Sequence, residues 1–318
     1  MTKDSLRIVY MGTPDFAVES LRALVEGGYN VVAVITMPDK PIGRHGNQLQ
    51  PSPVKQYAME HGLYIMQPSN LKDPAFVEEL RSLKADLQIV VAFRMLPQVV
   101  WQMPPLGTFN AHASLLPKYR GAAPINWAVI NGEKETGVTT FFLKHEIDTG
   151  DIIQQVKIGI SDTDNVEVVH DKLMKLSGQL VIETVNNIIA GTVKSIPQDD
   201  IKDIIPTPAP KIFRDTCRIC WNQPSKKAHD FIRGLSPYPA AWTTLNGKSV
   251  KITEAFPMTD IQSQAEPGTI ATDQKTYLHV ATSDGWLDIR TLQIEGKKRM
   301  ATADLLRGMK IEDGSCFG

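Results

Sequence analysis

Short apolar runs alternate with helical patterns over the first two-thirds of the chain, and this alternation restricts the fold more than any other feature. The apolar runs lie at 6–11, 31–36, 87–92, 108–113 and 138–143. Helical spacing covers 16–26, and a longer helical stretch at 165–190 begins at Asn165, a favourable N-cap residue. Strands that alternate with helices predict an α/β fold with a mainly parallel, Rossmann-like sheet covered by helices on both faces.

A proline-rich segment divides the sequence into two parts. Pro206, Pro208 and Pro210 lie close together, and proline opposes both helix and sheet, so this segment is predicted to be an interdomain linker. Beyond it, short β-rich runs are separated by Gly, Asp and Asn, which is typical of a small β-barrel or sandwich. We therefore expect one domain at 1–205, a linker at 206–211 and a β-barrel domain at 212–318.

The two parts differ in charge. The whole chain has 34 basic and 35 acidic residues and a net charge of −1, which excludes a polybasic protein. Residues 1–207 have 19 basic and 23 acidic side chains, whereas residues 208–318 have 15 and 12 and include the cluster Lys297-Lys298-Arg299. The positive balance of the second part suits an anionic partner such as a nucleic acid, although a solvated charged face has the same composition.

Cysteine content and hydropathy indicate the compartment. Three cysteines are too few, and an odd number, for a disulfide framework, which favours a reducing environment. No run approaches the roughly 18 apolar residues of a membrane-spanning helix, and the first residues lack a signal-peptide pattern. We expect a cytoplasmic protein without a membrane partner.

Three polar residues are predicted to converge at one edge of the sheet. Alternate residues of a strand share a face, so Asn110 and His112 place an amide and an imidazole side by side at a strand end. Asp148 lies in a polar loop between two strand-like runs. Ligands of open parallel sheets bind at the carboxyl ends of strands, where such a loop can return a carboxylate to the same crevice.

This combination suits the transfer of an acyl group to an amine. Attack by the amine forms a tetrahedral oxyanion, which an Asn amide or a protonated His stabilises by donating hydrogen bonds. The amine must also lose a proton, which His or a water held by a carboxylate accepts. A buried His that only caps the strand end is the alternative that Asn110 and His112 by themselves leave open.

Other motifs restrict the chemistry further. The sequence has no Gly-x-Ser-x-Gly elbow and no Cys beside a His, so direct attack is favoured over a covalent acyl-enzyme. The turn Gly12-Thr13-Pro14 lacks the Gly-x-Gly-x-x-Gly pattern of dinucleotide sites. Cys217 and Cys220 have the spacing of zinc ligands but no second pair, so we expect no metal.

The residues around the three polar side chains resemble the signature of the folate-dependent formyltransferases. The similarity runs in order through 110–117 (NAHASLLP), 119–127 (YRGAAPINW), 137–140 (GVTT) and 148–152 (DTGDI). This family includes members that act on glycinamide ribonucleotide and on sugar nucleotides. The resemblance to the family therefore indicates the reaction, but not which amine accepts the formyl group.

Further segments resemble the branch of that family that formylates methionyl-tRNA. They are 11–17 (MGTPDFA), 38–44 (PDKPIGR), 51–55 (PSPVK), 234–242 (GLSPYPAAW) and 295–300 (EGKKRM). The resemblance implies 10-formyltetrahydrofolate as formyl donor and initiator methionyl-tRNA as acceptor, in translation initiation. It also implies that the C-terminal part is an OB-fold-like barrel that binds tRNA, and nothing in the sequence requires more than a monomer.

The same resemblance implies roles for individual residues. Asn110 and His112 would stabilise the oxyanion, and Asp148 would hold His112 and help to relay the proton. The implied folate contacts are Phe93, Arg94, Met95, Leu96, Ser114, Leu115, Leu116, Pro117 and Ile147. The implied tRNA contacts are Lys40, Arg44, His45, Lys297, Lys298 and Arg299. The sequence of segment 92–97 resembles the members that act on glycinamide ribonucleotide more than it resembles the methionyl-tRNA branch.

The residues leave two other functions open. A formyltransferase for a small amine, such as an amino sugar nucleotide, shares the catalytic set but has no need of the basic loop at 40–44 or the basic C-terminal part. A nonenzymatic tRNA-binding module has no need of an intact Asn110, His112 and Asp148.

Overall fold

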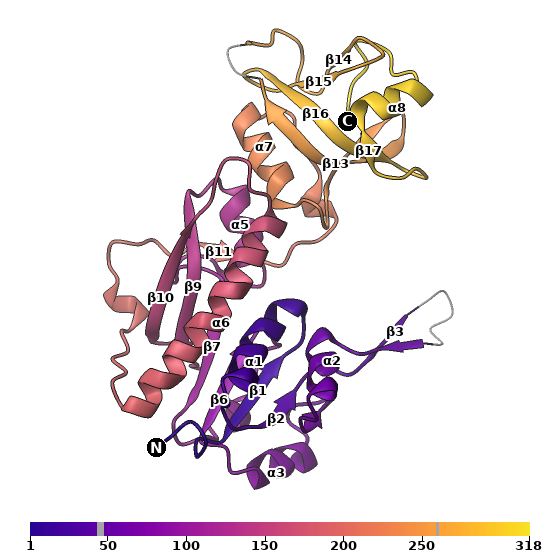
Figure 1. Cartoon of the computed structure of the whole chain (residues 1–318). Helices are drawn as coiled ribbons and strands as arrows, with labels where there is room; N and C mark the ends of the chain where they lie inside the picture. The colour runs from indigo at the N-terminus through magenta and orange to yellow at the C-terminus, as the bar shows by residue number, and fades with distance from the viewer. Residues whose placement is uncertain (43–47, 259–260) are drawn as a thin grey trace. The chain divides into compact units, whose positions relative to one another are not determined.

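The computed structural model describes residues 1–42, 48–258 and 261–318, which form two compact units (Figure 1). Unit 1 comprises Met1–Gly121, Thr136–Ile158 and His170–Pro208. Unit 2 comprises Ala122–Glu135, Gly159–Val169 and Ala209–Gly318. Unit 2 thus contains two short segments from the middle of the chain in addition to the C-terminal part.

Unit 1 is built on a seven-stranded sheet with the order β10-β9-β7-β6-β1-β2-β5. Strands β5, β2, β1, β6 and β7 are parallel, and β9 is antiparallel to β7. The predicted mainly parallel α/β fold is therefore confirmed. The strands are β1 (Ile8–Gly12), β2 (Val31–Ile35), β5 (Ile65–Met66), β6 (Leu87–Val91), β7 (Thr108–His112), β9 (Glu135–Phe142) and β10 (Ile152–Gly159).

Burial explains why these elements form where they do. Every residue of β1 and β6 is buried, which accounts for their continuous apolar sequences. The helices that accompany the sheet are α1 (Asp15–Glu26), α2 (Pro53–Glu60), α3 (Pro74–Ser82), α4 (Gln98–Trp101) and α6 (Val166–Ala190). Ser52 caps α2 by accepting a hydrogen bond from the Lys55 N–H at 3.1 Å. None of the described helices is both long and apolar enough to cross a membrane.

The strand order creates a switch point beside β1. From β1 the chain moves to β2 and β5 on one side, and later returns to β6 on the other side. Ligands of open α/β sheets bind outside the carboxyl ends of the strands at such a point. Strand β7, which is next to β6, ends at His112 on this edge.

Unit 2 contains an antiparallel sheet with the order β12-β13-β16-β15-β14, and β17 pairs with β16. This confirms the predicted C-terminal β domain. Apolar side chains of the sheet and of two helices, Ile232 and Leu305 among them, share one buried core. The elements are α5 (Pro124–Ile130), α7 (Ser225–Gly234), β12 (Ala241–Leu245), β13 (Lys248–Pro257), β14 (Ile270–Thr272), β15 (Leu278–Ala281), β16 (Trp286–Ile294), β17 (Met300–Ala301) and α8 (Thr302–Gly308).

The proline-rich segment is bound to the loop that follows β7. Strand β11 (Pro208–Ala209) pairs with β8 (Arg120–Gly121). One residue earlier in each segment, the Tyr119 N–H donates to the Thr207 carbonyl at 2.6 Å. The segment is therefore a paired strand beside the turn that follows the site residues of β7 rather than only a spacer.

Candidate active site

Strand β7 carries Asn110 and His112 to the carboxyl edge of the sheet. In the sheet, Asn110 is opposite Val90 of β6 and Phe141 of β9, and His112 is opposite Thr139. The strand is buried except at Asn110, which is partly exposed, and His112 is only 7% exposed. Alternation along the strand puts both side chains on one face, so the predicted amide and imidazole lie together.

The ring of His112 is held by one backbone carbonyl. Its Nε2 lies 2.8 Å from the carbonyl oxygen of Tyr119. A carbonyl oxygen only accepts, so Nε2 carries the proton of this hydrogen bond and Nδ1 is the unprotonated nitrogen of the neutral ring. Nδ1 lies 3.9 Å from Oδ2 of Asp148. In this tautomer, Nδ1 is the ring atom that can exchange a proton with a reactant.

Asp148 is held beside His112 by backbone contacts. Its φ of 55° lies in the left-handed region, which is uncommon for a residue with a side chain and requires support from neighbouring groups. Oδ2 accepts a hydrogen bond from the Gly121 N–H at 2.9 Å. The carboxylate is mostly buried. The structure thus brings together the three residues predicted to carry catalysis.

Asn110 has a buried oxygen that the described protein does not satisfy. Within residues 1–42, 48–258 and 261–318, no donor reaches its Oδ1. Buried polar atoms in proteins are nearly always hydrogen-bonded, so such an atom indicates a missing partner. An amide offers either its oxygen or its NH₂ group after a 180° rotation. Asn110 therefore fits a ligand that presents a donor or a developing oxyanion.

The turn after β7 uses its polar groups to fix its own shape. The buried Ser114 hydroxyl donates to the Lys118 carbonyl at 2.7 Å, and the Thr139 hydroxyl donates to the Ser114 carbonyl at 2.6 Å. The Leu116 N–H donates to Thr139 Oγ1 at 3.1 Å. Leu116 packs against Phe141 in a small core cluster. Ser114 and Leu116 of the folate set, together with the buried Pro117, are thus parts of the turn, and Leu115 is partly buried beside them.

The other folate candidates lie in two loops. The segment that follows β6 contains Phe93 and Leu96, which pack on a core cluster of unit 1. Arg94 donates to the Ser69 carbonyl at 2.8 Å and to the Pro68 carbonyl, so its guanidinium holds a neighbouring loop. Met95 and Ile147 are 72% and 59% exposed. These two apolar side chains are available to cover the apolar surface of a ligand.

The tRNA candidates are divided between the two units. Lys40 is exposed on β3 (Lys40–Ile42), which pairs with β4 (Gln48–Gln50), whereas Arg44 and His45 lie outside the described residues. Nearby, Lys55 forms an ion pair with Asp39 at 2.6 Å, which holds the pKa of that carboxyl below its usual range.

In unit 2, the turn between β16 and β17 exposes Lys297, Lys298 and Arg299. Arg299 also donates to the Pro237 carbonyl at 3.0 Å.

Some residues at or near these sites have no strong signal in the sequence. Gln198, in the short helix η1 (Gln198–Asp200), donates hydrogen bonds to the loop that holds Asp148. In unit 2, the guanidinium groups of Arg214 and Arg218 each lie 5.6 Å from the ring of Trp242. A search for basic residues interleaved with aromatic ones would find the two arginines, but Gln198 is isolated in the sequence.

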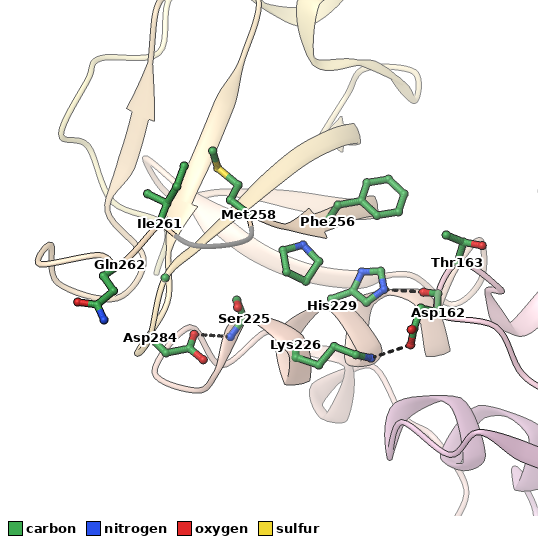
Figure 2. A pocket seen from close by; sticks show the side chains of 12 residues that line it. Asp162, Thr163, Ser225, Lys226, His229, Phe256, Met258, Ile261, Gln262 and Asp284 are labelled. Atoms are coloured by element: carbon green, nitrogen blue, oxygen red, sulfur yellow. Dashed lines mark hydrogen bonds and ion pairs between the residues drawn. The ribbon is translucent and has the colours of Figure 1, made fainter.

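Unit 2 also contains an open hollow of about 730 Å³ (Figure 2). His229 at its wall has Nδ1 2.7 Å from the Ala255 carbonyl and Nε2 2.9 Å from the Asp162 carbonyl. Lys226 forms an ion pair with Asp230, with 2.7 Å between Nζ and Oδ1. Because these polar groups are already bonded to protein atoms, His229 and Lys226 do not offer free groups for acyl transfer in the hollow. None of the predicted site residues that the structure describes lines it.

The two closely spaced cysteines differ in environment. Cys217 is buried and Cys220 is exposed, and neither is in a disulfide. Burial raises the pKa of the Cys217 thiol, which keeps it protonated. Across the described part of the chain, no group of three His, Cys, Asp or Glu side chains is arranged to hold a metal ion.

Comparison with known proteins defines the class. Residues 6–185 match the formyl transferase family, and residues 211–310 match the formyl transferase C-terminal domain. The solved N-formyltransferase from Helicobacter canadensis, in complex with folinic acid and dTDP-3-aminofucose, is 20% identical with a TM-score of 0.68, over 93% of this chain and 100% of that one. HypX from Aquifex aeolicus with tetrahydrofolic acid is 20% identical with a TM-score of 0.62, over 97% of this chain and 49% of that one. At this identity the structures show the shared fold, and the family matches place the chain among the formyl transferases.

Closer relatives define the branch. The methionyl-tRNA formyltransferase of Bacteroides fragilis is 64% identical over 98% of both chains. The protein of the same name from Porphyromonas gingivalis is 48% identical over 98% of both chains. The chain belongs to the methionyl-tRNA formyltransferase family, which confirms the resemblance seen in the sequence.

Proposed function

We propose that the protein transfers the formyl group of 10-formyltetrahydrofolate to the amino group of initiator methionyl-tRNA, in translation initiation. The observation that carries the proposal is the convergence of Asn110, His112 and Asp148 at the carboxyl end of β7, with His112 Nδ1 3.9 Å from Asp148 Oδ2. The similar proteins of Bacteroides fragilis and Porphyromonas gingivalis bear the name methionyl-tRNA formyltransferase, which supports formyl transfer to methionyl-tRNA. The protein would act as a cytoplasmic monomer.

The geometry of the site supports the proposed roles. The amine attacks the formyl carbon directly and forms a tetrahedral intermediate, whose negative oxygen accepts a hydrogen bond from the Asn110 amide and, once Nδ1 is protonated, a second one from the His112 ring. Because Nε2 of His112 is bonded to the Tyr119 carbonyl, Nδ1 is the atom that takes a proton. The carboxylate of Asp148 then stabilises the resulting imidazolium. The intermediate collapses as the bond between the formyl carbon and N10 of the folate breaks, and the proton passes from Nδ1 to N10, so that tetrahydrofolate leaves and the amine keeps the formyl group.

The residues around this centre fit a folate. 10-Formyltetrahydrofolate supplies the formyl carbon, a flat pterin ring with many hydrogen-bonding groups, and an apolar benzene ring. The unpaired Oδ1 of Asn110 and the exposed Met95 and Ile147 offer a polar and an apolar contact respectively. We propose that the set Phe93, Arg94, Met95, Leu96, Ser114, Leu115, Leu116, Pro117 and Ile147 forms the folate pocket.

The proposed tRNA-binding part is the basic C-terminal region. We propose a catalytic domain at 1–205, a linker at 206–211 and a tRNA-binding domain at 212–318. Exposed Lys297 and Lys298 supply positive charge, as does the arrangement of Arg214 and Arg218 around Trp242. Guanidinium groups and aromatic rings together bind phosphates and stack on bases. Lys40, Arg44 and His45 would contact the acceptor arm, and Arg299 would add to the C-terminal contacts.

One assay separates the candidate functions. The purified protein is incubated with 10-formyltetrahydrofolate and either charged initiator tRNA or an amino sugar nucleotide. We expect formylmethionyl-tRNA, measured by separation of the formylated amino acid after deacylation. The sugar acceptor is included because the similar Helicobacter structure holds such a nucleotide. Formylation of the sugar alone would contradict the proposed acceptor, and tRNA binding without formylation would favour a nonenzymatic module.

The basic and aromatic cluster should contribute through charge. Replacing both Arg214 and Arg218 by Ala is expected to raise KM for tRNA and leave kcat nearly unchanged. The dependence of log KM on log salt should become shallower by about one to two units, because each lost phosphate contact removes roughly one released counterion. The matched control is replacement of Lys72 and Arg81, two exposed cations of unit 1. An unchanged salt slope in the Arg214/Arg218 variant would remove this cluster from the tRNA-binding surface.

A further inference from the structure

We infer that Gln198 is a positioning residue for formyl transfer, because its buried amide joins the backbone around Asp148 to Arg120 and thereby holds the catalytic carboxylate in place. The inference deepens the proposed function and rests on it. Gln198 lies fifty residues from Asp148 along the chain, and its amide bonds to Arg120, Asp148 and Gly150 rather than to His112. Its influence on the reaction would pass through Asp148.

The amide nitrogen of Gln198 fixes the Asp148 loop at two points. Nε2 donates to the Asp148 carbonyl and to the Gly150 carbonyl, both at 2.8 Å. The residue is 3% exposed, so water does not compete for these carbonyls. The two bonds enclose Thr149 and begin at the residue whose φ is 55°. A left-handed conformation at Asp148 is retained only while such contacts hold it.

The amide oxygen of Gln198 binds the residue that precedes the hydrogen-bond donor of the carboxylate. Oε1 accepts from Arg120 Nε at 3.0 Å and from Arg120 Nη2 at 2.7 Å. The next residue, Gly121, donates its N–H to Asp148 Oδ2 at 2.9 Å. These hydrogen bonds and the peptide bond between Arg120 and Gly121 therefore form a closed ring, which links Gln198, Arg120, Gly121 and Asp148. The ring restrains Asp148 through both its backbone carbonyl and its side-chain oxygen.

A primary amide is the side chain that meets these requirements. Two carbonyls need donors, and a guanidinium needs an acceptor, at the two ends of one planar group. A Glu side chain would place a second acceptor against the two carbonyls, and Leu would remove the partner that Gln198 gives to these carbonyls and to the partly buried Arg120 guanidinium. In either case the Asp148 loop is released, and a displacement of about 1 Å at a catalytic group lowers the rate by up to about 100-fold.

The central experiment is a double-mutant comparison with pre-steady-state formylation of charged initiator tRNA. Gln198→Leu in the otherwise native protein is expected to lower kcat by about 10- to 100-fold, with KM for both substrates within about twofold of the native values. In an Asp148→Ala background, the same change is expected to have almost no additional effect, because the group that Gln198 positions is absent. A merely structural role would lower the rate by the same factor in both backgrounds and would overturn the inference.

A matched glutamine serves as the control. The amide of Gln154 on β10 donates a hydrogen bond to Glu183 at 2.8 Å and accepts one from Thr184 at 3.0 Å. These contacts do not reach the Asp148 loop. Gln154→Leu is expected to keep native kcat. If Gln198→Leu does not fold, the comparison is made with Gln198→Asn and Arg120→Lys, which retain part of the hydrogen-bond ring and should give smaller defects that also vanish without Asp148.

The outcomes separate this inference from the proposed function. A native protein that does not formylate tRNA overturns the proposed function and the positioning role with it. A native protein that formylates tRNA, alongside a Gln198→Leu variant with native kcat, overturns the positioning role alone.

Discussion

Replacement of His112 by Ala is expected to lower the rate of formyl transfer by about two to four orders of magnitude. The Nδ1 atom is the only ring nitrogen of His112 that can exchange a proton, because Nε2 is bonded to the Tyr119 carbonyl at 2.8 Å. The same ring supplies a hydrogen bond to the oxyanion once it is protonated. Alanine removes both contributions, while a methyl group at a buried strand end leaves β7 intact. Single-turnover formylation at saturating folate measures the chemical step.

Two variants test whether this loss comes from the chemistry. His112→Gln retains an amide that can donate to the Tyr119 carbonyl but lacks a basic nitrogen, so it should fold and be nearly as slow as His112→Ala. His279→Ala is a matched control, since His279 also faces a carboxylate, with Nε2 3.7 Å from Asp288 Oδ1. Burial lowers the pKa of His279 despite Asp288, so its ring is neutral near pH 7. Native turnover in His112→Ala would remove His112 from the mechanism, whatever the control shows.

The pairing of Asn110 with His112 could be predicted because it depends on local geometry. Side chains two residues apart in a strand share a face, and an apolar run followed by Pro117 marks where a strand ends. The structure shows β7 ending at His112, one residue earlier than the apolar run. Asp148 could be expected near them because its loop lies between two strands of the same sheet. The mainly parallel sheet follows equally from the alternation of buried strands and helices.

The support around Asp148 could not be predicted in this way. Gln198 and Arg120 are separated by 78 residues and are brought together only by tertiary structure, next to the pairing of β8 with β11. A single Gln between Pro197 and Asp199 has no periodicity and no motif that indicates a buried amide. The composition of unit 2 could not be predicted from local patterns either. Ala122–Glu135 and Gly159–Val169 belong to it because of tertiary contacts such as the packing of α5 on α7. Local patterns carry no information on such contacts.

Replacement of Gly150 by Ala should impair both activity and stability, because the Asp148 loop closes directly on β9 at this glycine. A Cβ added at Gly150 would lie 1.6 Å from the Phe142 carbonyl oxygen and 2.8 Å from its carbonyl carbon, and both atoms belong to the backbone. Neither can give way without moving the strand, so the loop must shift. We expect the free energy of unfolding to fall by about 1–3 kcal/mol, as in overpacked interiors, and turnover to fall by at least about 100-fold. Urea unfolding and single-turnover formylation measure the two effects.

The glycine control distinguishes this close approach from the general effect of a methyl group. At Gly159, which ends β10, an added Cβ would meet only the Lys134 carbonyl oxygen at 4.0 Å, so Gly159→Ala should keep native turnover and stability. The two losses at Gly150 also need not move together. A variant that is destabilised but fully active would show that the loop can leave β9 while Asp148 stays beside His112, which contradicts the expected coupling. Loss of turnover in a variant with native stability would instead mean that the loop shifts at little cost in free energy, and that the ring of hydrogen bonds through Gln198 alone does not hold Asp148 in place.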